Sequence, residues 1–256
     1  MNTPNNTSIS KATDCLLKVG ALLMGAGAST NRIKLTLDRY AEALGYECEL
    51  LVTHRTVFIL VRDLEHQTQL NSFTKTPPHG ANFYLVSGIS KLGWRLTQEQ
   101  LSIEDINTKL ETLQHKPRYT LFTTITLVSL ADAAFCRLFG AEYFDMLIAF
   151  VATALAFLVK HYATSLRFNP YLTVSFASFT ACLITGAAIH FGIGTHPELA
   201  FNTAVLFLIP GIPLINSFTD LIEGFTSNGI VRGTHAMLIA FSIALGMIAT
   251  MYLYNF

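Results

Sequence analysis

Apolar residues are distributed very unevenly along this chain of 256 residues. Beyond residue 118 they form five long runs, which are 119–139, 143–162, 171–193, 199–215 and 236–256. A helix needs about 20 consecutive apolar residues to cross a membrane. Four of the runs reach that length, whereas the fourth in order is shorter and contains Pro210. The pattern predicts a polytopic α-helical membrane protein with about five transmembrane helices, one of them broken.

The first 118 residues show shorter periods. Apolar residues spaced three to four positions apart predict helices at 9–24, 29–44, 82–96 and 102–113. The β-rich runs "ECELLVT" and "TVFILV" are separated only by His54 and Arg55, which predicts a hairpin, and "LNSFTK" predicts a further strand. This part of the chain is therefore expected to form a small α+β domain.

The charge distribution supports a division into two domains. Residues 1–118 carry 24 of the 34 charged residues. We therefore expect an N-terminal cytoplasmic α+β domain at 1–118 and a five-span transmembrane domain at 119–256. The polar N-terminus lacks the pattern of a secretory signal.

The loops between the apolar runs predict the orientation. One side of the membrane receives Lys116, Arg118, Lys160, Arg167 and Arg232, and the other receives only Arg137. Lys and Arg accumulate in cytoplasmic loops. The N-terminus is therefore expected in the cytoplasm and the C-terminus outside.

The fourth apolar run contains the sequence "LIPGIPLINSFTDLIEG". Its prolines and glycine predict an interruption at 210–213, and polar residues lie on both sides of it. Non-helical backbone is tolerated at membrane depth only where protein or water satisfies it, and transporters place such breaks at their substrate sites. The candidate transport-pathway residues here are Asn202, Pro210, Gly211, Pro213, Asn216, Ser217 and Asp220.

Asp132 is the second feature that is unusual for a membrane segment. It lies well inside the first run, in "TLVSLADAAF". An ionisable residue at such a position is costly and is by default a functional hypothesis. It can exchange protons during transport, or it can form an ion pair that holds helices together.

The sequence "GAGAST" precedes the second predicted helix. A helix start offers free N–H groups and a favourable dipole to an anion. The residues that would form a cytoplasmic ligand site or gating turn are Gly25, Gly27, Ser29, Thr30 and Arg32. The alternative is a tight turn of small residues between two packed helices.

No catalytic or metal-binding motif accompanies these features. The four cysteines are scattered and are expected to be small buried residues. There is no Gly-x-Ser-x-Gly sequence, no P-loop and no helical metal motif. The sequence thus predicts a protein that is not an enzyme, has no cofactor or metal, and does not bind nucleic acid.

Several of these segments resemble one known family. "GAGASTNRIKLTLDRYAEALG", "SGISKLGWRL", and "LIPGIPLINSFTDLIEG" followed by "NGIVRG" are similar to sequences of the bacterial threonine/serine exporters. The resemblance extends over nearly the whole chain from about Ile9. It implies export of a small hydrophilic metabolite, such as threonine, serine or a dicarboxylate like succinate, across the bacterial cytoplasmic (inner) membrane.

The family resemblance also implies a partner. Long members have about ten spans, and split members divide into a longer half with the cytoplasmic domain and a short membrane-only half. This chain is similar to the longer half, so we expect a hetero-oligomer with a membrane-only subunit and the proton as coupling ion. The alternative is a membrane-anchored enzyme with a hydrolase-like cytoplasmic domain.

Overall fold

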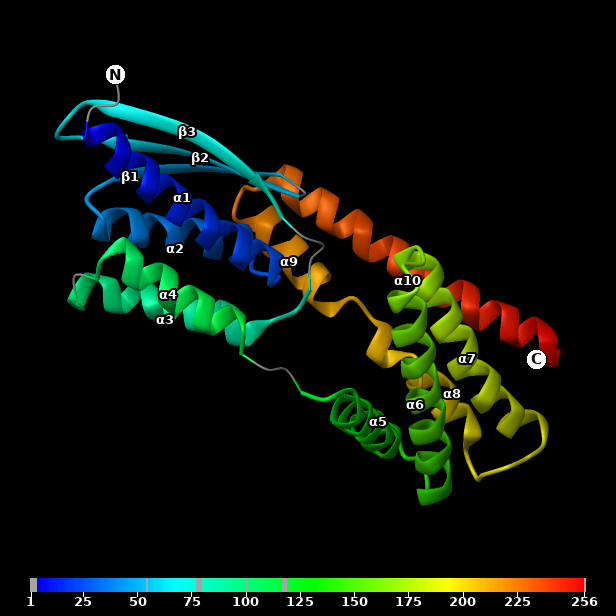
Figure 1. Cartoon of the computed structure of the whole chain (residues 1–256). Coiled ribbons are helices and arrows are strands. Elements are labelled where there is room, and N and C mark those ends of the chain that lie inside the picture. Colours follow the sequence, from blue (N-terminus) through cyan, green and yellow to red (C-terminus); the bar gives the residue numbers. More distant parts are fainter. Residues whose placement is uncertain (1–3, 54, 77–79, 100, 117–118, 256) are drawn as a thin grey trace. The chain divides into compact units, whose positions relative to one another are not determined.

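A computed structural model describes the chain except for residues 1–3, 54, 77–79, 100, 117–118 and 256 (Figure 1). Two residues used above, His54 and Arg118, therefore lie outside the described residues. The chain forms two compact units. Unit 1 combines residues 1–117 with 212–234, and unit 2 combines 118–211 with 235–256. A segment from the predicted membrane region is thus grouped with the N-terminal residues.

Unit 1 has the expected mixture of helices and strands. Its N-terminal elements are α1 (Pro4–Gly25), α2 (Thr30–Ala43), β1 (Glu47–Thr53), β2 (Thr56–Asp63), β3 (Thr68–Lys75), α3 (Phe83–Glu99) and α4 (Ile103–Gln114). Helix α9 (Gly211–Ile222) and the first turns of α10 (Thr226–Tyr254) complete the unit. The predicted helices, the hairpin and the additional strand are all present, with ends that differ by a few residues.

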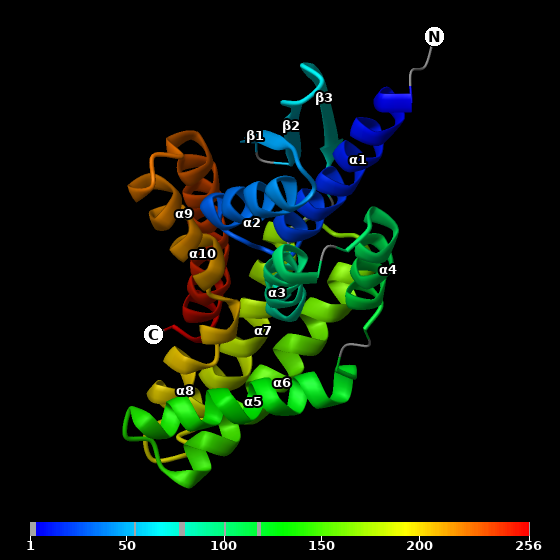
Figure 2. The same ribbon diagram turned by 90° about the vertical axis from the view of Figure 1, so that its left-hand side faces the viewer.

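The N-terminal elements form three layers. The sheet lies against α1 and α2, and α3 and α4 cover the other side of these two helices (Figures 1 and 2). The sheet is antiparallel in the order β1-β2-β3. Val57, Ile59 and Val61 alternate along β2 and are buried on its helix-facing side. The opposite face of the sheet is exposed.

Helix α2 is held in the middle layer by its apolar face. Ile33, Leu37, Tyr40 and Ala41 are buried, as their spacing predicts. The Tyr40 hydroxyl donates a hydrogen bond to the Ile89 carbonyl at 3.0 Å, so the polar end of this large side chain is satisfied within the core.

Helix α4 begins at the predicted residue. The Ser102 hydroxyl accepts from the Asp105 amide at 3.2 Å, and the Asp105 carboxylate accepts from the Ser102 amide at 3.3 Å. The bonds with Ser102 lower the pKa of Asp105. The carboxylate therefore stays charged at the positive end of the helix.

Unit 2 contains the long apolar helices. These are α5 (Leu121–Leu138), α6 (Tyr143–Ser165), α7 (Pro170–His190) and most of α10, and the short α8 (Pro197–Thr203) and the 3₁₀ helix η1 (Leu206–Leu208) lie between α7 and α9. Among the described residues, four helices are long and apolar enough to cross a membrane, or five if 197–222 forms one bent span. The protein is therefore a polytopic membrane protein.

The interruption in the bent span is shorter than the sequence predicts. Helix α9 already begins at Gly211, so only Ile209 and Pro210 separate it from η1. The sequence predicts that Pro213 is part of the break, but this residue lies in the first turn of α9. The first amides of a helix have no acceptor within it, so a proline there removes no hydrogen bond.

Helices α7 and α10 pack closely through small residues. The hydroxyl of Ser175 donates to the Ser242 carbonyl at 3.0 Å, and that of Ser178 donates to the Ile243 carbonyl at 2.8 Å. A Cβ added at Gly246 would lie 2.6 Å from the Phe179 amide nitrogen and 2.7 Å from the Ser175 oxygen. Membrane helices commonly use such small residues to bring their backbones together.

We expect Gly246→Ala to destabilise this helix pair by about 1–3 kcal/mol, because the methyl group meets backbone that cannot rotate away. The measurement is thermal unfolding of the purified protein in detergent. Ala249→Val is the matched control, since it adds apolar atoms at an exposed position of α10. Equal melting temperatures of the two variants would contradict the close approach.

Candidate functional site

The turn between α1 and α2 depends on glycine. Gly27 has φ of +84°, a conformation that residues with a Cβ rarely adopt. A Cβ there would also lie 3.1 Å from the Gly80 carbonyl oxygen. The Gly25 carbonyl accepts a hydrogen bond from the Gly80 amide at 2.9 Å. The predicted ligand or gating turn is thus fixed by backbone contacts with the segment that precedes α3.

An aspartate of the chain itself occupies the start of α2. Ser29 caps the helix by accepting a hydrogen bond from the Arg32 amide. The Thr30 amide donates to Asp220 Oδ1 at 3.0 Å, and the Thr30 hydroxyl donates to Asp220 Oδ2 at 3.0 Å. A helix start favours a negative charge. The expected anion position is therefore filled by the Asp220 carboxylate.

Arg232 neutralises this buried carboxylate. Its Nη1 lies 3.1 Å from Asp220 Oδ2, and its Nη2 donates to the Ala28 carbonyl at 3.1 Å. The Asp220 side chain is completely buried, and that of Arg232 is 14% exposed. Removing one member of such a pair is strongly destabilising because the other charge stays buried.

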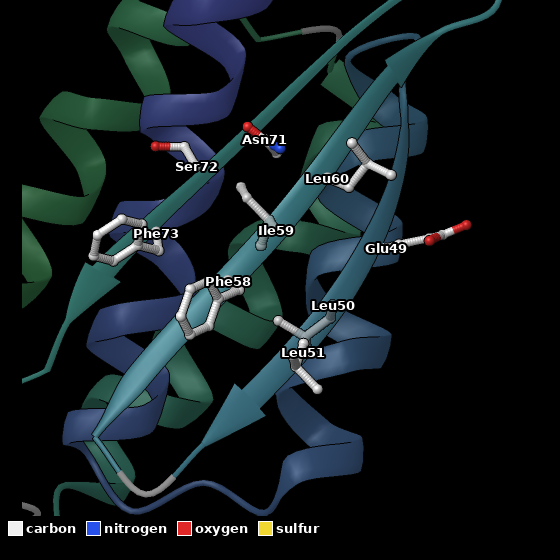
Figure 3. Close-up of a pocket in the computed structure, with 9 residues that line it drawn as sticks. All are labelled: Glu49, Leu50, Leu51, Phe58, Ile59, Leu60, Asn71, Ser72 and Phe73. Carbon is white, nitrogen blue, oxygen red and sulfur yellow. The ribbon is translucent and has the colours of Figure 1, made fainter.

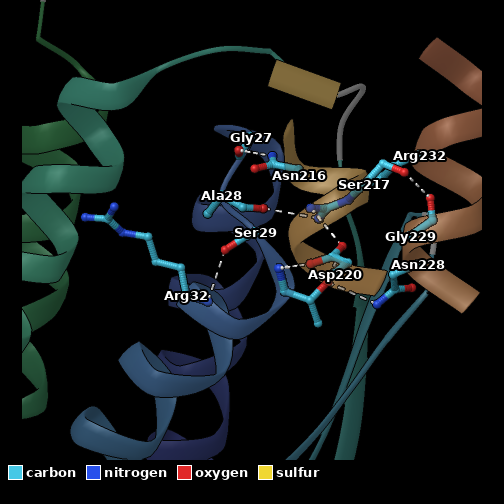
Figure 4. Close-up of polar contacts among 11 residues, drawn as sticks. Gly27, Ala28, Ser29, Arg32, Asn216, Ser217, Asp220, Asn228, Gly229 and Arg232 are labelled. Atoms are coloured by element: carbon cyan, nitrogen blue, oxygen red, sulfur yellow. Dashed lines mark hydrogen bonds and ion pairs between the residues drawn. The ribbon is translucent and has the colours of Figure 1, made fainter. Parts of the chain in front are cut away.

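Two asparagines extend the same network (Figure 4). Asn216 Nδ2 donates to the Gly27 carbonyl at 2.8 Å, and Asn228 Nδ2 donates to the Thr30 hydroxyl at 3.2 Å. We call this set of residues the Asp220 cluster, and its members are Gly27, Ala28, Thr30, Asn216, Asp220, Asn228 and Arg232. It joins the two segments that the sequence analysis selected separately, the turn before α2 and the residues after the break.

Other predicted site residues lie outside the cluster. The Arg32 side chain is exposed and is directed away from Asp220 (Figure 4). Asn202 is exposed on α8 of unit 2. The Ser217 hydroxyl donates to the Gly229 carbonyl at 2.7 Å, so it connects α9 to α10. The pathway role of these residues stays a prediction.

Sequence reasoning missed the role of two members. Arg232 was used only as a charge that indicates orientation, and Asn228 was not selected. Both lie in "NGIVRG", the motif that follows the broken span. The available signal was that Asp220 and Arg232 are close in sequence and have opposite charge. Charged residues near membrane segments are rarely left unpaired, so an ion pair between them could have been expected.

Asp132 is buried in unit 2 with few partners. It is 3% exposed, and Thr153 Oγ1 on α6 donates to its Oδ2 at 2.7 Å. Among the described residues, its Oδ1 has no hydrogen-bond partner, and the same holds for the hydroxyl of Ser129, one turn earlier on the buried face of α5. No basic residue is paired with Asp132 in the described part of the chain, so the structure does not support the ion-pair alternative.

Asp145 is a buried carboxylate of unit 2 with which Asp132 can be compared. It is fully buried at the start of α6 and accepts from the amides of Glu142, Thr195 and His196, each at 3.1 Å. Asp132 has one hydrogen-bond donor where Asp145 has three, so hydrogen bonds hold its carboxylate less firmly.

The comparison with known families follows the same residues. The model of the threonine/serine exporter family, ThrE, matches residues 14–254. The chain belongs to this family. The match includes the turn before α2, the broken span and the α10 segment that supplies Arg232. The family is described as one of putative threonine/serine exporters, that is, of membrane transporters.

Two curated relatives of this ThrE chain bear the name "Probable succinate transporter subunit YjjP". The one from Klebsiella aerogenes is 24% identical over 237 residues, which cover 91% of this chain and 90% of that protein. The one from Escherichia coli K12 is 22% identical over 240 residues, or 93% of each chain. No solved structure matches the chain.

The thiols of this ThrE chain do not suggest chemistry. Cys15, Cys136 and Cys182 are buried, as predicted, and Cys48 is half-buried. Burial raises the pKa of Cys15 to about 11 and that of Cys48 to about 12, so both stay protonated at neutral pH. No group of three or more potential metal ligands occurs among the described residues.

Proposed function

We propose that this chain is one subunit of a bacterial inner-membrane exporter for a small hydrophilic metabolite, either a threonine- or serine-like amino acid or a dicarboxylate such as succinate. The observation that carries the proposal is the bent span followed by the buried polar Asp220 cluster, within a chain of the exporter family. An anchor needs neither the break nor the polar residues, whereas a transport pathway uses both.

The orientation is proposed with the N-terminal fold in the cytoplasm and the C-terminus outside. The distribution of Lys and Arg supports this proposal, because these residues accumulate in cytoplasmic loops and five of the six near the apolar runs fall on the side of the N-terminal residues. Counting the bent pair 197–222 as one span gives five spans, which places the C-terminus on the other side.

Proton coupling is proposed through Asp132. A carboxylate that is buried with one donor gains little from being charged, so it can accept a proton at small cost. Binding a proton from outside and releasing it inside would drive export of the metabolite. The second, membrane-only subunit is proposed because both curated relatives are named as subunits.

The direct test is reconstitution into liposomes. We expect the chain with its membrane-only subunit to move threonine, serine or succinate against a concentration gradient when a proton gradient is imposed, and the chain alone to move none. A protonophore is the control and should stop transport. Full transport by the chain alone would overturn the two-subunit proposal, and hydrolysis of a substrate by the isolated chain would revive the enzyme alternative, which the family does not favour.

The break itself should matter for transport. In the double variant Pro210→Leu/Gly211→Ala, η1 and α9 can join into one continuous helix. The double variant removes a proline, which costs about 3 kcal/mol or more inside a helix. Export by this variant should fall at least about tenfold, equivalent to about 1.4 kcal/mol in the barrier.

Pro213→Ala is the matched control for the break. Its proline lies in the first turn of α9, where no amide donor is needed, so export should stay near the native rate. Immunoblots of the membrane fraction measure insertion of both variants. If the double variant inserts normally and exports at the native rate, the break is a tolerated kink.

A further inference from the structure

The three-stranded sheet of unit 1 has an exposed apolar face. Leu51, Phe58 and Phe73 are 63%, 39% and 60% exposed, although they are large apolar side chains. With neighbouring residues they line a groove of about 510 Å³ (Figure 3). Figure 3 also shows the helices behind the sheet, on its other side. The side chains of this outer face are thus left largely uncovered in the described part of unit 1.

The apolar residues form a continuous row across the strands. The strand register pairs Leu51 with Phe58, and Phe58 with Phe73. The rings of Phe58 and Phe73 stack with their centres 5.2 Å apart. Leu60 lies two residues further along β2, where its partners on the neighbouring strands are Glu49 and Asn71. Apolar patches of this kind on a soluble face mark interaction sites.

The two ends of the same face have opposite charge. At one end Glu47 and Glu49 flank Arg62, which forms an ion pair with Glu49 at 3.0 Å. At the other end lie Arg55, in the β1–β2 turn, and Lys75, the last residue of β3. One end is therefore acidic, the other is basic, and the apolar row lies between them.

We propose that the outer face of this sheet docks against the same face of a second copy of the chain. A two-fold axis that runs across the strands, along the row of Leu51, Phe58 and Phe73, reverses the ends of the second sheet. The acidic end of each copy then faces the basic end of the other, and the apolar rows meet in the middle. A self-complementary surface is what a two-fold interface requires. Sheets packed in this way lie about 10 Å apart.

The charges argue against the other occupants. An anionic lipid surface would attract the basic end but repel Glu47 and Glu49 at the other. A chain of unrelated sequence would need its own matching pattern of charge, whereas a second copy supplies it by symmetry. The dimer is independent of the substrate and the coupling ion proposed above.

Cross-linking between single cysteines tests this geometry in native membranes. Two differently tagged copies of the full chain carry Cys48→Ser together with either Glu47→Cys or Thr53→Cys. Positions 47 and 53 lie on one face of β1, six residues and about 20 Å apart. In the reversed dimer, position 47 of one copy is offset by about 7 Å along the strands from position 53 of the other, so the two lie about 12 Å apart across the sheets.

We expect a bismaleimide that spans about 13 Å to join positions 47 and 53 at least about fivefold more efficiently than two copies of position 47, because the latter are about 27 Å apart along the strands. Leu35→Cys, exposed on α2, is the background control. Cross-linking no higher than this control, equal cross-linking of all pairs, or cross-links only to the membrane-only subunit or to lipid would overturn the proposal.

A second variant tests the apolar row. Phe58→Glu should reduce the 47-to-53 cross-link at least about tenfold, since it places two buried charges in the interface. Leu35→Glu, which makes the same change in chemistry elsewhere on unit 1, should not reduce it. Fluorescence of Trp94, the single tryptophan, checks that both variants are folded. A folded Phe58→Glu chain that cross-links like the native one would also overturn the proposal.

Discussion

Replacing Asp220 with alanine is expected to destabilise unit 1 by about 3–5 kcal/mol, the largest stability effect that we expect from a single substitution in this chain. Two donors lose their acceptor at once, namely the amide and the hydroxyl of Thr30, and the Arg232 guanidinium loses its ion-pair partner. The guanidinium is then left buried without a counter-charge. For a unit of this size the apparent melting temperature should fall by roughly 10 °C.

Fluorescence of Trp94 measures this change, because the residue lies on α3 of unit 1. Glu223→Gln is the matched control: Glu223 also accepts from α2, through Asn31 Nδ2 at 2.7 Å, but it is exposed. The control should shift the melting temperature very little. Adding Arg232→Met to Asp220→Ala should recover part of the loss by removing the unpaired charge. A melting temperature unchanged by Asp220→Ala would refute the buried ion pair.

Replacing Asp132 with asparagine is expected to abolish gradient-driven export while leaving the protein folded. The asparagine side chain has the same shape and can still accept the hydrogen bond from Thr153, but it cannot bind and release a proton. The loss should exceed about a hundredfold, equivalent to about 2.7 kcal/mol. Uptake of protons into liposomes, followed with a pH-sensitive dye during export, measures coupling directly.

Asp145→Asn provides the contrast. Asp145 accepts from three backbone amides, so an asparagine amide group would face donors and lower the stability of the loop before α8. That variant should have a lower melting temperature and lower abundance, and export per folded molecule should persist. If Asp132→Asn behaves in the same way, its carboxylate is structural. Native export by Asp132→Asn would exclude it from both roles.

The sequence by itself determined the elements of this protein. Runs of about 20 apolar residues have few alternatives to a membrane helix, so their number and position follow from composition alone. Alternation in "TVFILV" and the helical spacing of Ile33, Leu37 and Tyr40 likewise identified buried faces, because each period is a local property of the backbone. Pro210 located the break for the same reason.

Only the tertiary structure decided what the polar residues contact. Thr30 and Asp220 are 190 positions apart, and no local pattern indicates that the start of one helix is capped by a carboxylate from another. Pro213 shows the same limit on a smaller scale, since a proline breaks a helix interior but not its first turn, and the start of α9 depends on how the segment packs. Local periodicity thus determines which face of a helix is buried. The partner of a buried charge depends instead on long-range packing, and no short segment of the sequence specifies that packing.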